Sequence, residues 1–137
     1  MTSSPNRGPL TEFFRSRRQS FRYAFAGWRF VIHTQPNAWI HALVSIAVIL
    51  LALWLKLTWQ GWVFIILAIA MVWMAEFFNT ALEAVVDLAS HHEQNELARI
   101  GKDVGAAAVL MAALASVLIG LFVLGPPLWA RIQAWFN

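Results

Sequence analysis

Acidic and amide side chains with a helical spacing are the first feature of this chain that could do chemistry. The segment from Glu76 to Asp87 reads Glu-Phe-Phe-Asn-Thr-Ala-Leu-Glu-Ala-Val-Val-Asp. At about 100° per residue in an α-helix, its polar residues fall on one face and its apolar residues on the others. That face carries Glu76, Asn79, Thr80, Glu83 and Asp87. Such a stripe could bind a cation or move a proton.

Three aligned carboxylates repel one another in a medium of low dielectric constant. Burying them costs several kcal/mol per ion unless something positive lies nearby. A basic side chain, either Lys102 or an N-terminal arginine, could supply that charge, and so could a divalent cation. A solvated acidic stripe outside the membrane is the simpler interpretation, and it is reasonable for Asp87. It fits Glu76 poorly, because Glu76 follows the uncharged stretch 57–75 and ionisable residues within spans usually have a function.

The composition indicates a membrane protein. The chain has 137 residues, of which 60% are hydrophobic and 12% charged, whereas a soluble domain averages about 25% charged residues. Three apolar runs are each long enough to cross about 30 Å of hydrocarbon. We therefore predict an all-α membrane protein with transmembrane helices at about 38–57, 59–88 and 103–125. The chain has no cysteine, which excludes disulfides and thiolate metal sites.

The segment before the first apolar run is amphipathic. Aromatic residues recur along 10–33, with arginines on a neighbouring face. This pattern predicts a helix lying on the membrane surface, although a cytoplasmic helix packed against the bundle fits equally well. Residues 1–9 are predicted to be a disordered lead. Gly125-Pro126-Pro127 is predicted to end the third span, so that 10–125 form a single domain and 126–137 an amphipathic tail.

Charged loops predict the orientation. Six of the ten basic residues precede the first span, and two lie in the loop 89–103. The positive-inside rule places both segments in the cytoplasm, and the acidic stripe ends on that side. A basic segment beside a span attracts anionic lipid headgroups, so we expect no nucleic-acid partner.

Small residues form a stripe along the third span, at Gly105, Ala108, Ala112, Ser116 and Gly120. Such a stripe lets a neighbouring helix approach closely. Packing within one chain and packing between subunits are equally compatible with it.

Three motifs resemble one known family. Glu-x-x-Asn-Thr-Ala-x-Glu-x-x-x-Asp begins at Glu76, Lys-Asp-x-x-x-Ala-Ala-Val-Leu begins at Lys102, and Ser-Phe-Arg-Tyr-Ala-x-x-Gly begins at Ser20. Together they resemble the prokaryotic diacylglycerol kinase and undecaprenol kinase family, over residues 20 to about 125. The first and third motifs look closer to the undecaprenol branch.

The resemblance implies a homotrimeric lipid kinase in the inner membrane of a bacterium, with three transmembrane helices and an N-terminal surface helix per subunit. Its N-terminus would be cytoplasmic. Its substrates would be Mg²⁺-bound ATP and a lipid alcohol, either diacylglycerol or undecaprenol, and the γ-phosphate would be transferred at the cytoplasmic interface. Phosphoryl transfer needs mainly positioning and charge neutralisation, which a metal ion and a lysine can supply.

The resemblance also implies roles for single residues. Glu76 would be the general base on the lipid hydroxyl, and Glu83 would bind the metal. The residues implied in nucleotide binding are Tyr23, Asn79, Asp87, Lys102 and Asp103. Lys102 and Asp103 stand where the third span is predicted to begin, and a helix N-terminus favours phosphate.

One position departs from the family pattern. The family usually has a second metal-binding glutamate before the first span, and this chain has Gln35 there. A neutral amide is a weaker magnesium ligand than a carboxylate. A catalytically silent assembly protein of the same fold is therefore the main alternative. A transporter that uses the acidic stripe as its pathway is a third interpretation, which the clustering of acids on one side disfavours.

Overall fold

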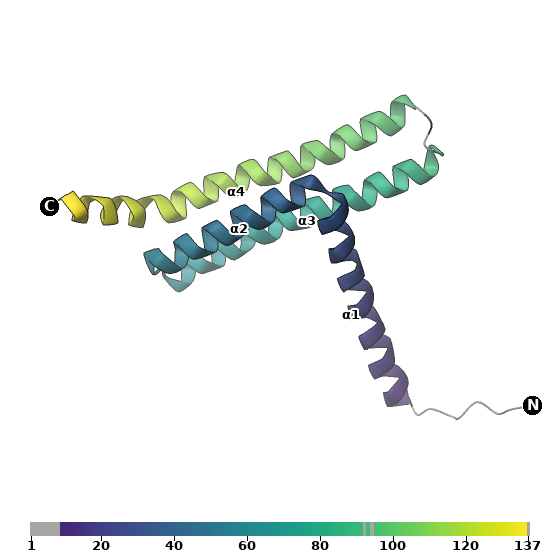
Figure 1. Ribbon diagram of the computed structural model, residues 1–137, viewed down its shortest axis with the longest axis horizontal. Helices are drawn as coiled ribbons and strands as arrows, with labels where there is room; N and C mark the ends of the chain where they lie inside the picture. Colours follow the sequence, from purple (N-terminus) through teal and green to yellow (C-terminus); the bar gives the residue numbers. More distant parts are fainter. Residues whose placement is uncertain (1–8, 92, 94, 137) are drawn as a thin grey trace, which may run out of the picture. The chain divides into compact units, whose positions relative to one another are not determined.

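Four helices make up the part of the chain that the structure, a computed structural model, describes: residues 9–91, 93 and 95–136. The disordered lead predicted for 1–9 lies outside that part, except for Pro9. The helices are α1 (Pro9–Thr34), α2 (Pro36–Leu55), α3 (Trp59–Ala89) and α4 (Glu96–Phe136) (Figure 1). This all-helical architecture confirms the predicted fold class.

Helix α1 belongs to a unit that ends at Thr34, and the residues from Gln35 onward form a second unit. Within α1, Arg17 places its guanidinium carbon 5.3 Å from the centre of the Phe13 ring. The Gln19 amide donates a hydrogen bond to the Tyr23 hydroxyl at 2.7 Å. Apart from Val31 and Ile32, the side chains described in α1 are exposed.

Backbone conformation at two positions sets the ends of α2. Gln35 is extended, with φ −106° and ψ 110°, because the proline that follows disfavours a helical residue before it. Pro36 suits the first turn, where its missing N–H has no helical partner. At the other end Lys56 adopts a left-handed conformation with φ 54°. Its N–H bonds to the Leu53 carbonyl at 3.1 Å, which closes the helix.

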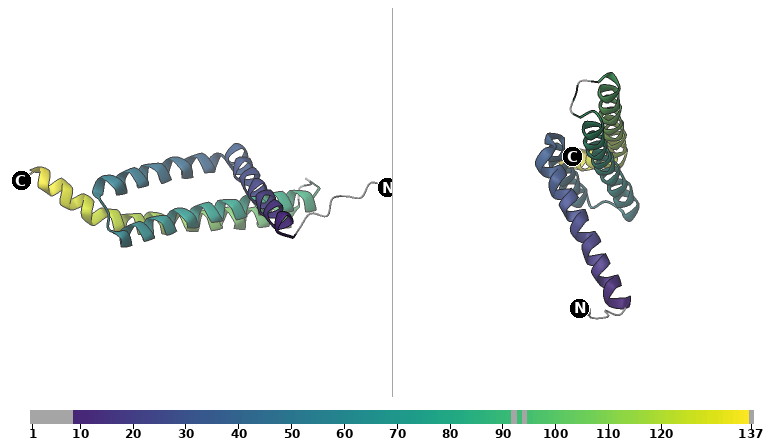
Figure 2. Two further views of the ribbon diagram at one scale, coloured as in Figure 1. Left: turned by 90° about the horizontal axis from the view of Figure 1, so that it is seen from below. Right: turned by 90° about the vertical axis from the view of Figure 1, so that its right-hand side faces the viewer.

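The second unit is a bundle of three helices. Helices α3 and α4 run antiparallel and side by side, and α2 lies along them (Figures 1 and 2). The buried cluster of Ala52, Leu55, Ile65 and Leu124 joins all three helices near the α2–α3 turn. Few of the other apolar side chains are buried, which leaves most of the hydrophobic surface facing outward.

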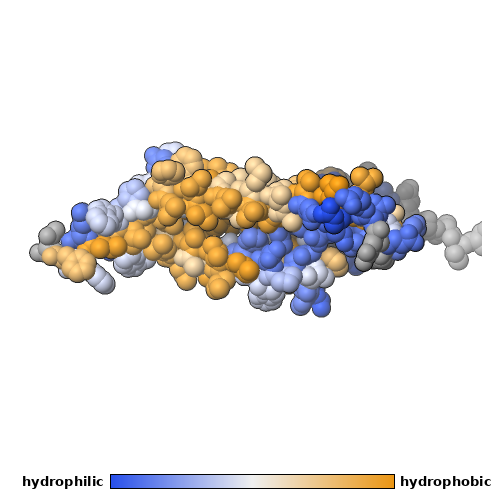
Figure 3. Space-filling model, turned by 90° about the horizontal axis from the view of Figure 1, so that it is seen from above, coloured by the Kyte–Doolittle hydropathy of each residue, from blue (hydrophilic) through white to orange (hydrophobic). Residues whose placement is uncertain are grey.

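The three helices α2, α3 and α4 are each long and apolar enough to cross a membrane. One face of the molecule shows hydrophobic residues gathered over a broad area, with hydrophilic residues concentrated toward one end (Figure 3). A surface of this kind matches a hydrocarbon environment rather than water.

Part of the small-residue stripe packs within the chain. Gly105 and Ala112 are buried, and the Ser116 hydroxyl donates to the Ala68 carbonyl of α3 at 2.9 Å. Ala108 is exposed. At Gly105 and Ser116 the stripe therefore serves the contact between α3 and α4.

The prediction that Gly125-Pro126-Pro127 ends the third helix is wrong. Helix α4 begins at Glu96, about two turns earlier than predicted, and continues through Pro126 and Pro127 to Phe136. A proline removes one N–H and bends a helix, but neighbouring groups can maintain the turns on either side. Beyond the prolines, Arg131 donates to the Trp54 carbonyl at 3.4 Å and its guanidinium lies 5.3 Å from the Trp54 ring centre.

Candidate functional site

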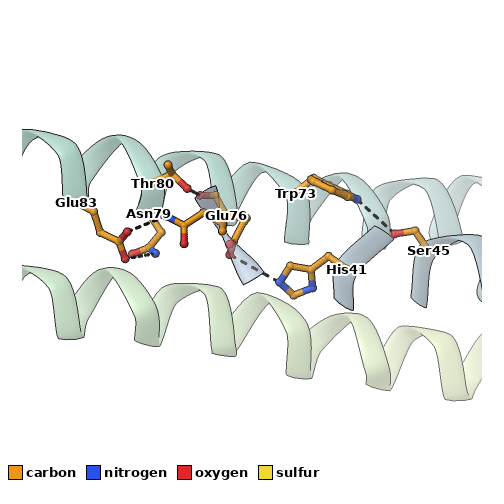
Figure 4. Close-up of polar contacts among 8 residues, drawn as sticks. His41, Ser45, Trp73, Glu76, Asn79, Thr80 and Glu83 are labelled. Carbon is orange, nitrogen blue, oxygen red and sulfur yellow. Dashed lines mark hydrogen bonds and ion pairs between the residues drawn. The ribbon is translucent and has the colours of Figure 1, made fainter. Parts of the chain in front are cut away.

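The polar stripe of α3 faces inward. Glu76 is 1% exposed, and Asn79 and Thr80 are also buried. Glu83 and Asp87, nearer the α3–α4 loop, are half-buried. The prediction that these five side chains share one face is confirmed, and that face points toward the other helices of the bundle. Figure 4 shows four of them along α3, with Glu76 directed toward His41 of α2.

Both oxygens of the Glu83 carboxylate accept amide hydrogen bonds. The Gln35 amide donates to Oε2 at 2.9 Å, and the Asn79 amide donates to Oε1 at 3.0 Å. The first bond ties the residue before α2 to α3, across 48 positions of sequence. Gln35 thus lies beside Glu83, where the family resemblance predicts a second metal ligand.

The carboxylate of Glu76 lacks such support. Within the described residues, neither of its oxygens has a hydrogen-bond partner. The nearest basic group is the His41 imidazole, with Nε2 3.7 Å from Oε2 (Figure 4). The Thr80 hydroxyl is engaged elsewhere, since it donates to the Glu76 backbone carbonyl at 2.9 Å.

Helix α4 approaches the stripe at a glycine. Gly105 is buried against Asn79, and a Cβ built there would overlap the Asn79 Oδ1 atom. That Oδ1 atom is itself buried with no hydrogen-bond partner among the described residues. Only glycine at 105 allows α4 this close to the amide.

A polar cavity lies at the end of the bundle that carries the α3–α4 loop. Its volume is about 690 Å³, and its charged lining residues are Asp87, Glu93, Glu96, Arg99 and Lys102. Lys102 Nζ lies 2.5 Å from Asp87 Oδ1. The prediction that Lys102 neutralises part of the acidic stripe therefore holds at Asp87.

Two of the predicted nucleotide residues in the second unit, Asn79 and Asp103, lie outside this cavity's lining. Asp103 is exposed and accepts a hydrogen bond from Arg99 at 2.9 Å. Because α4 begins at Glu96, Lys102 and Asp103 lie in its second turn, and the prediction that they stand at a helix N-terminus is wrong. Tyr23 is exposed on α1, and its part in nucleotide binding stays a prediction.

An apolar cavity of about 450 Å³ adjoins the site on its other side. It runs between the three helices of the bundle, and its lining includes His41 and Ser45 near one end of α2 and Leu51 farther along. His41, which lines this cavity, lies 3.7 Å from the Glu76 carboxylate, and Glu76 itself is not part of the lining.

The donor set suits a hard divalent cation. Carboxylate and amide oxygens are the ligands that Mg²⁺ prefers, and Glu83 and the unpartnered Asn79 Oδ1 atom supply them. Among the residues described, no three His, Cys, Asp or Glu side chains come close enough to form a metal cage.

The sequence analysis missed His41 as a neighbour of Glu76. A signal was present: His41 and Ser45 are the polar residues within 39–55, and they lie four positions apart, on one helical face. Polar residues that share a face of a span usually point into the protein.

Comparison with known proteins identifies the family. A family model described as prokaryotic diacylglycerol kinase matches residues 22–124. The chain is 45% identical over 109 residues to a diacylglycerol kinase of Synechocystis sp., which covers 80% of this chain and 62% of that protein. It is 35% identical over 130 residues to an undecaprenol kinase of Bacillus subtilis, which covers 93% of this chain and all of that protein. The chain spans less than two thirds of the Synechocystis protein. With the family model matching most of its length, this chain belongs to the prokaryotic diacylglycerol kinase family.

Proposed function

We propose that this protein transfers the γ-phosphate of ATP to the hydroxyl of a membrane lipid. The observation that carries the proposal is the buried Glu76 carboxylate, whose two oxygens have no hydrogen-bond partner among the described residues. It lies two helical turns from Glu83 in a chain of a lipid kinase family. A buried carboxylate without a hydrogen-bond partner lowers the stability of the fold. A role as the base that accepts the hydroxyl proton explains why such a residue is kept at this place.

In the proposed reaction Glu76 takes the proton of the lipid hydroxyl. The hydroxyl oxygen attacks the γ-phosphorus, the bond from that phosphorus to the β–γ bridging oxygen breaks, and ADP leaves. Glu83 and Asn79 would hold Mg²⁺, which when bound neutralises charge on the phosphates. Lys102 and Asp87 would line the triphosphate's place in the 690 Å³ cavity.

The two cavities support a division of the substrates. The polar one is lined by charged side chains and suits a nucleotide. The apolar one is lined mostly by aliphatic side chains and reaches His41, so a lipid tail in it would bring its hydroxyl toward Glu76. Diacylglycerol and undecaprenol both carry a primary hydroxyl on an apolar tail, and the B. subtilis and Synechocystis relatives bear the names of the two activities.

The membrane arrangement belongs to the same proposal. We place the protein in the inner membrane of a bacterium, with its N-terminus and the α3–α4 loop in the cytoplasm. Helix α1 would lie on the membrane surface, where its arginines meet anionic headgroups. Three copies would form the working enzyme, since the outward apolar faces of α2 to α4 leave ample surface for contacts between subunits.

The direct test is phosphate transfer in detergent micelles. The purified chain is supplied with labelled ATP, Mg²⁺ and either diacylglycerol or undecaprenol in parallel. Label is expected in one or both lipids and not in a lipid whose hydroxyl is methylated. Transfer to neither lipid would favour the alternative of a silent assembly protein, which the Gln35 amide at the metal position supports.

Restoring a carboxylate at position 35 is expected to strengthen metal binding. In Gln35→Glu the new carboxylate would lie where the Gln35 amide now meets Glu83 Oε2 at 2.9 Å. Two carboxylates this close repel one another, and a divalent cation between them relieves the repulsion. A magnesium titration of activity should show half-saturation at a lower concentration than in the wild type. An unchanged titration would contradict the idea, and Gln133→Glu, at an exposed position of α4, is the matched control.

A further inference from the structure

His41 and Glu76 face each other inside the bundle. Among the described residues, no hydrogen bond is made by the polar atoms that they turn toward each other. The Glu76 side chain is 1% exposed and the His41 side chain 15% exposed. His41 Nε2 and both Glu76 carboxylate oxygens are buried without hydrogen-bond partners among the described residues. The separation of 3.7 Å between Nε2 and Oε2 exceeds the usual 2.7 to 3.2 Å of an N–H···O hydrogen bond, by roughly half an ångström.

A shift of that size would satisfy both groups at once. Leaving a buried donor or acceptor unpaired costs about 1–3 kcal/mol, and more for a charged group. Hydrogen bonds in active sites are often long without substrate and tighten when it binds. A hydrogen bond between the two side chains would remove this penalty, so we expect them to move together and form it.

The other candidate partners of Glu76 are engaged elsewhere. The amides of Gln35 and Asn79 donate to Glu83, and Lys102 pairs with Asp87. Among the ion pairs of the described residues, the contact with His41 is the one that includes Glu76.

His41 is itself held from the side. Its ring lies edge-on to Trp73, with the ring centres 6.4 Å apart and the planes at 67°. The Trp73 indole N–H donates to the Ser45 hydroxyl at 3.3 Å, one turn along α2 from His41 (Figure 4). Trp73 also contacts the Phe77 ring at 6.0 Å. This packing fixes the imidazole with Nε2 toward Glu76.

We propose that His41 is a positioning residue for Glu76, a role that rests on the proposed kinase function. The imidazole donates its Nε2–H to Glu76 Oε2. That bond fixes the carboxylate rotation and leaves Oε1 to receive the hydroxyl proton of the lipid. Since His41 also lines the apolar cavity, it stands between the proposed place of the lipid tail and the base.

Kinetics of three variants test this role. His41→Phe keeps a ring but removes the donor, and it should lower kcat about 10- to 100-fold, as loss of a supporting hydrogen bond commonly does, with KM for ATP unchanged. His41→Gln keeps a donor of similar reach and should recover most of the lost kcat. His33→Phe, at an exposed histidine of α1, is the matched control and should behave as wild type.

Two kinetic results would overturn the proposal. One is wild-type kcat in His41→Phe. The other is a loss in His41→Gln as large as that in His41→Phe, since it would mean that the imidazole acts by packing alone. Absence of transfer by the wild type to any lipid would instead contradict the proposed function.

Nitrogen NMR of the full chain in micelles tests the contact between His41 and Glu76 independently of enzyme activity. The His41 Nε2 resonance, assigned by its loss in His41→Gln, should move when Glu76 is changed to alanine. It should stay in place in Glu12→Ala, which removes a carboxylate from α1. A resonance that is the same in wild type and Glu76→Ala would refute the pairing, whether or not the protein is a kinase.

Discussion

Glu76→Gln is expected to reduce phosphate transfer about 10²- to 10⁴-fold, the usual contribution of a general base. Glutamine has nearly the same shape as glutamate and can fill the same buried space between α3 and α2. It cannot accept the hydroxyl proton of the lipid, so kcat should fall. KM for ATP should change little, because Glu76 lies outside the lining of the polar cavity. The measurement is the steady-state rate in lipid–detergent micelles at saturating Mg²⁺.

Two comparisons make that result specific. Glu12→Gln removes an exposed carboxylate of α1 and should leave the rate unchanged. Glu83→Gln should instead raise the magnesium concentration needed for half-maximal activity, since Glu83 is the proposed metal ligand. Retention of near-wild-type kcat in Glu76→Gln would remove Glu76 from the reaction.

Gly105→Ala is expected to damage both activity and stability. The added methyl group would overlap Asn79 Oδ1, so either Asn79 rotates or α4 moves away from α3. Rotation of Asn79 would break its bond to Glu83 Oε1, now 3.0 Å. Overpacking of this kind costs about 1–3 kcal/mol. We expect a lower thermal unfolding midpoint and at least about a tenfold loss of kcat, read in the same micelles.

Gly101→Ala is the matched control, one turn earlier on α4. A Cβ there would lie 3.5 Å from Val86 Cγ2, an ordinary contact. Alanine favours a helix over glycine by about 1 kcal/mol, so this variant should be at least as stable as wild type. Equal losses in both variants would show that the approach of α4 to Asn79 has no special importance.

The sequence was sufficient to predict the helices and the polar stripe. Charge-free runs and a period of 3.6 residues follow directly from the needs of a spanning helix, and the inward face of Glu76, Asn79 and Thr80 agrees with that period. Such a pattern identifies which side chains of one helix share a face.

The contacts between helices could not be read in the same way. The pairing of His41 with Glu76 and of Gln35 with Glu83 depends on the register of α2 against α3, which no local pattern specifies. The ends of α4 could not be predicted from local sequence for a related reason. Prolines 126 and 127 are strong local breakers, yet the helix continues beyond them to where Arg131 contacts α2.

The two hydrogen bonds that the Glu83 carboxylate accepts have a consequence for how metal ions can enter the site. A bare cation that diffuses to this position must compete with the two amide donors already bound to Glu83. A cation delivered on a triphosphate brings its own oxygen ligands and can displace them more readily. Under the proposed function, the two amide hydrogen bonds to Glu83 would keep stray metal ions out of the site until a nucleotide brings its own.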